Sequence, residues 1–240
     1  MANPRIVGLV PMRHDSERVR GKNYRKLGGK PLFEHIVESL LDCSYIDEVV
    51  IDTDSSAIWT DAPKISSRIR MIERPEHLRD GATAMNDVLM HDVQQVGADF
   101  YLQTHSTNPL LRTETISDAV ETFLAQWPER DSLFGATRLQ SRLWTSQGEA
   151  VNHDPDVLLR TQDLPPIYEE NSNIYIFSGK TLIERHNRIG YRPILFEIDR
   201  AEAWDIDEEL DWEFAELLYA RRHSQEVLTN EWTGVLNNDY

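Results

Sequence analysis

Cysteine is nearly absent from this 240-residue sequence, which contains Cys43 and no other. One thiol cannot form an intramolecular disulfide or a cysteine-based metal site, so we expect Cys43 to be a small core residue. Long apolar runs are missing as well, because no stretch approaches the roughly 18 residues that a membrane span requires. The charged, proline-containing start differs from a secretory signal peptide. Together these absences predict a protein of the cytoplasm that has no membrane partner.

Basic residues are scarce: 25 lysines and arginines face 41 aspartates and glutamates, for a formal net charge of −16. Duplex nucleic acid and anionic membranes require a broad basic surface, so this balance excludes them as partners. The positive charges that are present gather at one end. Residues 1–30 hold eight Lys/Arg against two Asp/Glu, a net charge of +6, while the other 210 residues carry −22. A basic first segment in an acidic chain predicts a local site for a small anion.

Short apolar runs alternate with stretches of helical periodicity, and this alternation is typical of α/β proteins. We predict one domain over residues 1–240, built on a single doubly wound, mostly parallel sheet. The pattern weakens between about 138 and 170, where we expect a small insertion such as a subdomain or a dimerisation arm. The predicted strands are 5–10, 48–52, 70–72, 100–103, 132–137, 173–177 and 194–198. The predicted helices are 31–41, 84–96, 113–127 with Thr113 as its N-cap, and 210–221.

The loop after the first predicted strand is strongly basic. In open α/β sheets, ligands bind beyond the carboxyl ends of the strands, so the loops after the strands should carry the chemistry. This first loop contains Arg13, Arg18, Arg20 and Lys22. Side-chain cations, hydroxyls and backbone N–H groups are the donors that triphosphate oxygens require. Neither a Walker loop nor the Gly-rich dinucleotide fingerprint is present. The alternative is a solvated basic turn beside acidic neighbours.

A second unusual segment, Trp204–Asp211, is acidic. In an extended segment, residues i and i+2 point the same way, so Asp205 and Asp207 can converge on one cation while Ile206 faces the core. Oxygen ligands without a cysteine or histidine pattern suit Mg²⁺. The alternative is an acidic helix N-terminus that complements the helix dipole. A basic loop and a carboxylate pair together match metal-assisted phosphoryl or nucleotidyl transfer.

Several motifs resemble one enzyme family. Arg13-x-x-Ser16 with Lys22-Asn23 resembles the nucleotide-binding signature of the CMP-acylneuraminate cytidylyltransferases and the related CMP-ulosonic acid synthetases. The similarity extends, in order, through Gly29-Lys30-Pro31-Leu32, Ile51-Asp52-Thr53-Asp54, Arg74-Pro75-Glu76, Leu102-Gln103, Pro109-Leu110-Leu111-Arg112-Thr113, Asn171-Ser172-Asn173-Ile174-Tyr175-Ile176, and Asp205-Ile206-Asp207 with Leu210-Asp211. The resemblance implies a Rossmann-like nucleotidyltransferase fold, a homodimer, and the joining of CTP to a 2-keto-3-deoxy sugar acid. The products would be a CMP-sugar for surface glycans and pyrophosphate.

The resemblance also implies roles for individual residues. The nucleotide-binding residues would be Arg13, Ser16, Lys22, Asn23 and Arg74. Catalysis would rest on Lys22, Arg13 and Asp207, with Lys22 stabilising charge at the α-phosphate. The acceptor-binding residues would be Gln103, Arg160 and Asn171, and Asp205 and Asp207 would hold Mg²⁺. The nucleophile would be the anomeric hydroxyl of the sugar rather than a protein side chain.

Two positions depart from the family pattern. Glu17 stands where a lysine is usual, and Glu169 stands where an arginine is expected, although Arg160 lies upstream. Two alternatives therefore stay open: a nucleotidyltransferase acting on another sugar or polyol phosphate, and a non-catalytic homologue that binds a sugar nucleotide.

Overall fold

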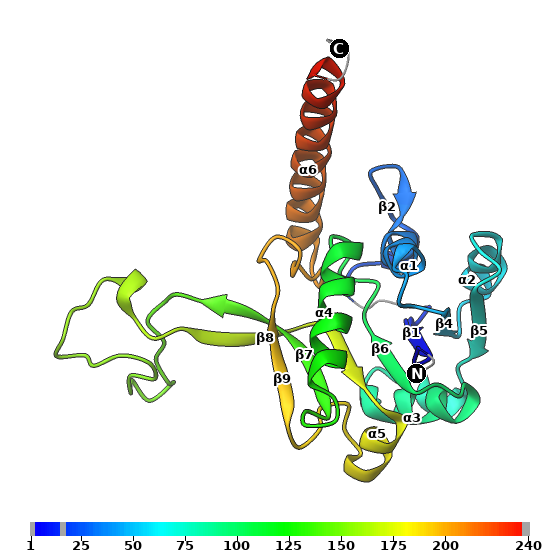
Figure 1. Cartoon of the computed structure of the whole chain (residues 1–240), viewed down its shortest axis with the longest axis horizontal. Helices are drawn as coiled ribbons and strands as arrows, with labels where there is room; N and C mark the ends of the chain where they lie inside the picture. Colours follow the sequence, from blue (N-terminus) through cyan, green and yellow to red (C-terminus); the bar gives the residue numbers. More distant parts are fainter. Residues whose placement is uncertain (1–2, 15–17, 237–240) are drawn as a thin grey trace.

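A seven-stranded sheet with the strand order β5-β4-β1-β6-β8-β7-β9 forms the centre of the molecule (Figure 1). The computed structural model describes residues 3–14 and 18–236. β8 runs antiparallel to both of its neighbours, and the other neighbouring pairs are parallel. The predicted α/β class with a mostly parallel sheet is therefore confirmed. The strands are β1 (Ile6–Leu9), β4 (Glu48–Thr53), β5 (Ile69–Glu73), β6 (Phe100–Gln103), β7 (Ser132–Leu139), β8 (Ile167–Phe177) and β9 (Pro193–Glu197).

Helices cover both faces of this sheet. α1 and α4 pack with one apolar cluster, and α3 and α5 pack with the other on the opposite face. Successive residues of β1 alternate between the two clusters, so a continuous apolar run is required there. The single cysteine, Cys43, lies buried in the first cluster, as expected. The helices are α1 (Leu32–Asp42), α2 (Ser56–Asp61), α3 (Met85–Gln95), α4 (Thr113–Gln126), α5 (Gly179–Arg185) and α6 (Glu209–Leu236), with short 3₁₀ turns η1 (Lys22–Tyr24), η2 (Ala62–Lys64), η3 (Glu76–Leu78) and η4 (Thr161–Asp163).

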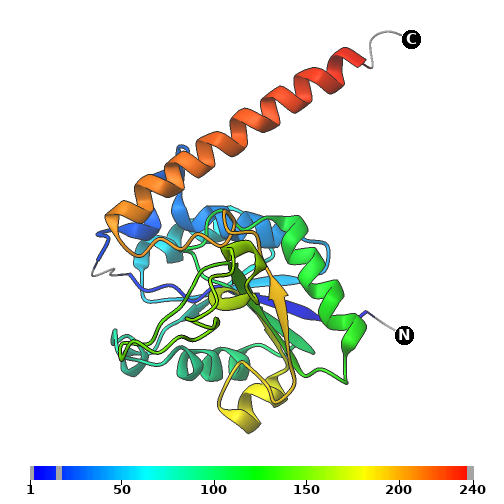
Figure 2. The same ribbon diagram turned by 90° about the vertical axis from the view of Figure 1, so that its left-hand side faces the viewer.

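Two details of the helix prediction are wrong. Thr113 is the first residue of α4 rather than its cap, because its hydroxyl donates to the carbonyl of Ser39 at 3.0 Å and so ties α4 to α1. The last helix, predicted for residues 210–221, continues to Leu236 and leaves the body of the molecule (Figure 2). The apolar spacing used for the prediction ends early, but no proline interrupts the segment that follows. No helix in the described part of the chain is both long and apolar enough to cross a bilayer.

The segment predicted as an insertion is the outer part of a long hairpin. β7 and β8 pair from Ala136–Glu170 to Leu139–Ile167, and this arm extends away from the sheet (Figure 1). Beyond Leu139 the backbone forms irregular loops before β8 begins, which explains the weak sequence pattern. The arm carries large exposed apolar side chains, and Leu158 is 88% exposed.

A small hairpin near the start of the chain packs against the last helix, α6. β2 (Lys26–Leu27) and β3 (Lys30–Pro31) are connected by Gly28 and Gly29, which both have positive φ, as a tight hairpin turn requires. Tyr219 of α6 packs against this turn so closely that a Cβ on Gly28 would lie 2.1 Å from its ring. The hairpin thereby fixes the start of α6 beside the loop that follows β1.

Candidate active site

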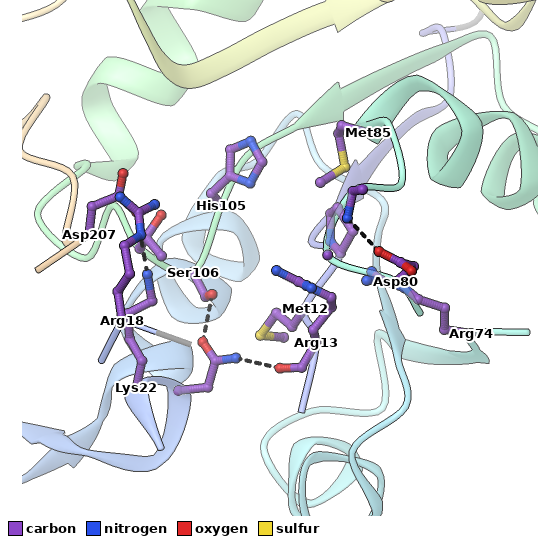
Figure 3. A pocket seen from close by; sticks show the side chains of 15 residues that line it. Met12, Arg13, Arg18, Lys22, Arg74, Asp80, Met85, His105, Ser106 and Asp207 are labelled. Carbon is purple, nitrogen blue, oxygen red and sulfur yellow. Dashed lines mark hydrogen bonds and ion pairs between the residues drawn. The ribbon is translucent and has the colours of Figure 1, made fainter. Parts of the chain in front are cut away.

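A cavity of about 510 Å³ lies where the loops after β1, β5 and β6 meet. Its volume suits a small-molecule ligand. Five residues with predicted roles line it, namely Arg13, Lys22, Asn23, Arg74 and Asp207 (Figure 3). Ser16 and Glu17 lie outside the described residues. Residues of the first loop and Asp207 of the acidic segment therefore line the same cavity.

Lys22 connects the two segments directly. It begins the 3₁₀ turn η1, and its side chain is only 11% exposed. Its Nζ donates to the carbonyl of Ile206 at 2.6 Å and lies 3.7 Å from Oδ1 of Asp207. Arg18 pairs with the same carboxylate at 2.8 Å. Burial lowers the pKa of Lys22, while the charges of Asp207 and Asp205 oppose that shift. The result is a half-desolvated cation at the cavity wall, where a phosphate oxygen would interact strongly with it.

Asn23 holds the shape of the loop through its amide. Its Nδ2 donates to the carbonyl of Arg13 at 3.0 Å, and its Oδ1 accepts from the hydroxyl of Ser106 at 2.7 Å. Because the amide is used in this way, Asn23 acts on the cavity chiefly by positioning the backbone of the Arg13 segment against the loop after β6. Figure 3 shows Arg13, Ser106 and Lys22 around the same space.

Arg74 is fixed by a buried carboxyl pair. It is 2% exposed, and its Nε donates to Oδ1 of Asp52 at the end of β4. Asp92 of α3 is also buried. Its Oδ1 and the Oδ2 of Asp52 have no hydrogen-bond partner among the described residues. Burial raises the pKa of Asp92 to about 9, and the neighbouring charge of Asp52 adds to the shift. One proton shared between the two carboxyls satisfies both oxygens.

The same two carboxyls and His91 form a group that could hold a metal ion, since one ligand atom from each lies within 4.8 Å of the others. It is the one such three-residue group in the described part of the chain. The Arg74 guanidinium already neutralises the charge of Asp52, and the raised pKa of Asp92 keeps that carboxyl protonated and neutral. A cation that bound to this cluster would therefore have to displace the proton of Asp92.

Asp205 and Asp207 flank Ile206, which is fully buried, as the alternation predicts. Asp207 lines the first cavity, and Asp205 lines a neighbouring cavity of about 280 Å³. Burial raises the pKa of Asp205, and the charge of Asp207 raises it further. Oδ1 of Asp205 is buried without a hydrogen-bond partner among the described residues. A buried orphan carboxylate oxygen beside a second carboxylate fits a hard divalent cation such as Mg²⁺.

The residues predicted to bind the acceptor lie in three different places. Asn171 lines the second cavity, and its Nδ2 donates to Oγ1 of Thr137 at 3.0 Å. Gln103 is 0% exposed, and its amide is already hydrogen-bonded on both sides. Arg160 lies on the arm, outside the residues that line either cavity, and pairs with Asp163 at 2.7 Å.

Sequence reasoning missed several residues of the site. The first cavity is also lined by Asp80, Met85 and His105 (Figure 3). The rule that ligands bind after the strands favours this edge of the sheet but singles out none of these three residues. Arg188, which donates to Gln103 at 2.6 Å, follows α5 rather than a strand, so no rule singled it out. The Asp52–Asp92 contact depends on how α3 packs against β4, which periodicity does not reveal.

Known proteins with similar sequences indicate the family to which this chain belongs. A family model described as cytidylyltransferase matches residues 7–230. A CMP-N,N'-diacetyllegionaminic acid synthase of Legionella pneumophila is 32% identical over 89% of this chain and 96% of its own length. A pseudaminic acid cytidylyltransferase of Campylobacter jejuni is 26% identical over 90% of this chain and 96% of its own length.

Among solved structures, a CMP:2-keto-3-deoxy-manno-octonic acid synthetase complexed with CTP superposes with a TM-score of 0.66 at 16% identity. That alignment covers 91% of this chain and 99% of the other. A 4-diphosphocytidyl-2C-methyl-D-erythritol synthase from Anaerococcus prevotii superposes equally well, with a TM-score of 0.66 at 12% identity, over 90% of this chain and 96% of its own. These two similarities concern the fold. The family match covers most of the sequence, and the chain therefore belongs to the cytidylyltransferase family of nucleotidyltransferase enzymes.

Proposed function

We propose that this enzyme transfers the cytidylyl group of CTP to a 2-keto-3-deoxy sugar acid. The observation that carries the proposal is the contact of Lys22 with the Ile206–Asp207 segment, which brings a buried cation and the Asp207 carboxylate to one cavity. The relatives that match over nearly the whole chain are named for sugar acids of this kind. Sequence and site geometry therefore support the same reaction class.

In the proposed reaction, the anomeric hydroxyl oxygen of the acceptor attacks the α-phosphorus of CTP. A new phosphorus–oxygen bond forms as the bond from the α-phosphorus to the bridging β-oxygen breaks, and pyrophosphate leaves. The hydroxyl proton passes to a carboxylate of the site. Lys22 and Arg13 stabilise the charge that develops on the phosphate oxygens, and Arg74 lies beside the nucleotide. Mg²⁺, held by Asp205 and Asp207, would supply further charge neutralisation for the leaving pyrophosphate.

We also propose a homodimer formed through the arms, in the cytoplasm, where nucleoside triphosphates are available. Exposed Trp144, Val157 and Leu158 give the arm an apolar surface of the kind that a protein interface covers. Arg160 lies outside both cavities of its own chain, so its predicted contact with the acceptor needs the arm of a second copy. Measuring the mass of the protein in solution, with Leu158→Glu as the disrupting variant, tests the dimer.

A pyrophosphate-release assay with CTP, Mg²⁺ and a panel of sugar acids tests the reaction itself. We expect turnover with at least one sugar acid and little with UTP, GTP or ATP. Asp207→Asn should reduce metal-dependent turnover by roughly 10²-fold or more while the far-UV spectrum is unchanged. Turnover only with phosphate-bearing acceptors would favour the transferase for another sugar or polyol phosphate. CTP binding without any turnover would indicate a non-catalytic homologue.

A further inference from the structure

Arg188 is a largely desolvated cation that forms no ion pair with the described residues, although the charge of Glu170 acts on it from a greater distance. Its Nη1 donates to Oε1 of Gln103 at 2.6 Å, and its guanidinium carbon lies 3.5 Å from the centroid of the Tyr175 ring. Among the described residues, no carboxylate lies within ion-pair distance of it, whereas Arg18 and Arg74 of the larger cavity both have one. Burial lowers the pKa of Arg188, as expected for a cation that has lost water.

Arg188 lines neither cavity itself, but its neighbours line both. Gln103 also hydrogen-bonds to Nε2 of His105 at 3.0 Å, and His105 lines the larger cavity. The charges of both Arg188 and Lys22 help to lower the pKa of His105, so this ring lies within reach of both cations. On the other side, the hydroxyl of Tyr175 donates to Glu170, which lines the smaller cavity. An anion beside Arg188 would therefore lie next to the nucleotide site.

The contacts of Arg188 fix its orientation but leave donors free. A guanidinium has five N–H donors in a planar fork, and the neutral oxygen of Gln103 accepts from one nitrogen. The ring of Tyr175 covers one face and so limits how the fork can turn. The direct contacts of Arg188 are neutral, and the charge of Glu170 reaches it only from beyond the Tyr175 hydroxyl. A planar fork binds a carboxylate with two parallel hydrogen bonds, so an anion in direct contact would stabilise this cation further.

We propose that Arg188 binds the carboxylate of the acidic acceptor, and that Gln103 and Tyr175 are the positioning residues that hold its guanidinium in place. The proposal rests on the proposed function, because it assigns the acceptor's charge to a residue of the same site. It also explains why Gln103 is fully buried: its amide supports Arg188 and His105 instead of facing the cavity. The other anion available at this place is a phosphate of CTP, and the experiment separates the two.

The test compares an accepted sugar acid with its neutral carboxamide in the wild type, Arg188→Gln and Arg188→Lys. We expect the wild type to have a KM for the acid about 30- to 100-fold lower than for the amide. In Arg188→Gln the two KM values should become nearly equal, while the KM for CTP stays within about twofold. Arg188→Lys should keep part of the preference, since the charge remains but the fork is lost. Lys180→Gln, which removes an 80% exposed cation from neighbouring α5, is the matched control and should keep the full preference.

Each outcome has one meaning. An undiminished preference for the acid in Arg188→Gln overturns the proposal, and a raised KM for CTP with an unchanged acid preference assigns Arg188 to the phosphates instead. A merely structural role would raise both acceptor KM values together and leave their ratio unchanged, which also contradicts the proposal. If Arg188→Gln does not fold, as judged by thermal unfolding and CTP binding, the acid-to-amide ratio of Arg188→Lys decides. If the wild type uses no sugar acid at all, the proposed function itself fails.

Discussion

Replacing Asp92 by asparagine should remove much of the pH dependence of this protein's stability. In the wild type, the buried Asp92 carboxyl keeps its proton and shares it with Asp52, which in turn pairs with Arg74. Asparagine is nearly the same size, and its amide N–H can donate to the same Asp52 oxygen. It cannot lose a proton, so the substitution keeps the hydrogen bond and removes the titration.

The sign and size of the effect follow from the two pKa values of Asp92. The ordinary value is 3.8, and burial raises it to about 9 in the folded protein. Below pH 3.8 both states hold the proton, and its stabilising effect is fully present. Between these two values only the folded state holds it, so stability falls by about 1.4 kcal/mol for each pH unit. Between pH 6 and 8 the wild type should therefore lose roughly 3 kcal/mol of stability through this one group, whereas Asp92→Asn should not.

Urea unfolding at pH 6, 7 and 8 measures this difference, because other titrating groups contribute equally to both proteins. Asp118→Asn, which removes an exposed carboxyl on α4, is the control and should follow the wild type. If the free energy of unfolding of Asp92→Asn fell with pH as steeply as that of the wild type, the shared proton would be refuted. A divalent-metal stabilisation that is present in the wild type and lost in Asp92→Asn would instead show that Asp52, His91 and Asp92 bind a cation.

Three further substitutions test other parts of the structure. Asp52→Asn leaves the buried Arg74 guanidinium without its carboxylate and should lower the free energy of unfolding in urea by roughly 3–5 kcal/mol. Gly28→Ala places a Cβ against the ring of Tyr219 at a positive φ and should lower the unfolding midpoint more than Gly29→Ala, where φ is also positive but the space is open. An equal effect of the two would contradict the close packing of α6. Lys22→Met should reduce kcat by roughly 10²–10³-fold with a smaller change in the KM for CTP, measured by pyrophosphate release; a change confined to KM would show that Lys22 only binds the nucleotide.

The parts of the site that the sequence predicts are those whose positions depend on strand order. Lys22 follows β1, and the rule that ligands bind at the carboxyl ends of strands places it at the cavity. The alternation across Asp205, Ile206 and Asp207 likewise predicts which side chain is buried. Family resemblance adds Arg74, although it says nothing about what holds that residue in place.

The remainder depends on packing between elements far apart in the sequence. Asp92 looks like an ordinary polar residue of α3, and only the docking of α3 beside β4 buries it against Asp52. Arg188 lies in a loop after a helix, and its contact with Gln103 spans 85 positions. The weak pattern over 138–170 predicts an insertion, but it does not predict the pairing of β7 with β8 in that segment, because much of the backbone between these strands is neither helix nor strand.

The hydrogen bond from Lys22 to the carbonyl of Ile206 joins residues 184 positions apart, and this has a consequence for how the protein is made. At roughly 5–20 residues per second, a ribosome needs about 10–40 s to travel from the first of these residues to the second. All seven strands of the central sheet, through β9, have been synthesised before the acidic partner of the basic loop exists. The nascent chain therefore spends most of its synthesis as an incomplete enzyme with an uncompensated basic loop. The contact between the basic loop and the acidic segment therefore forms late, when the segment that leads into α6 docks beside Lys22.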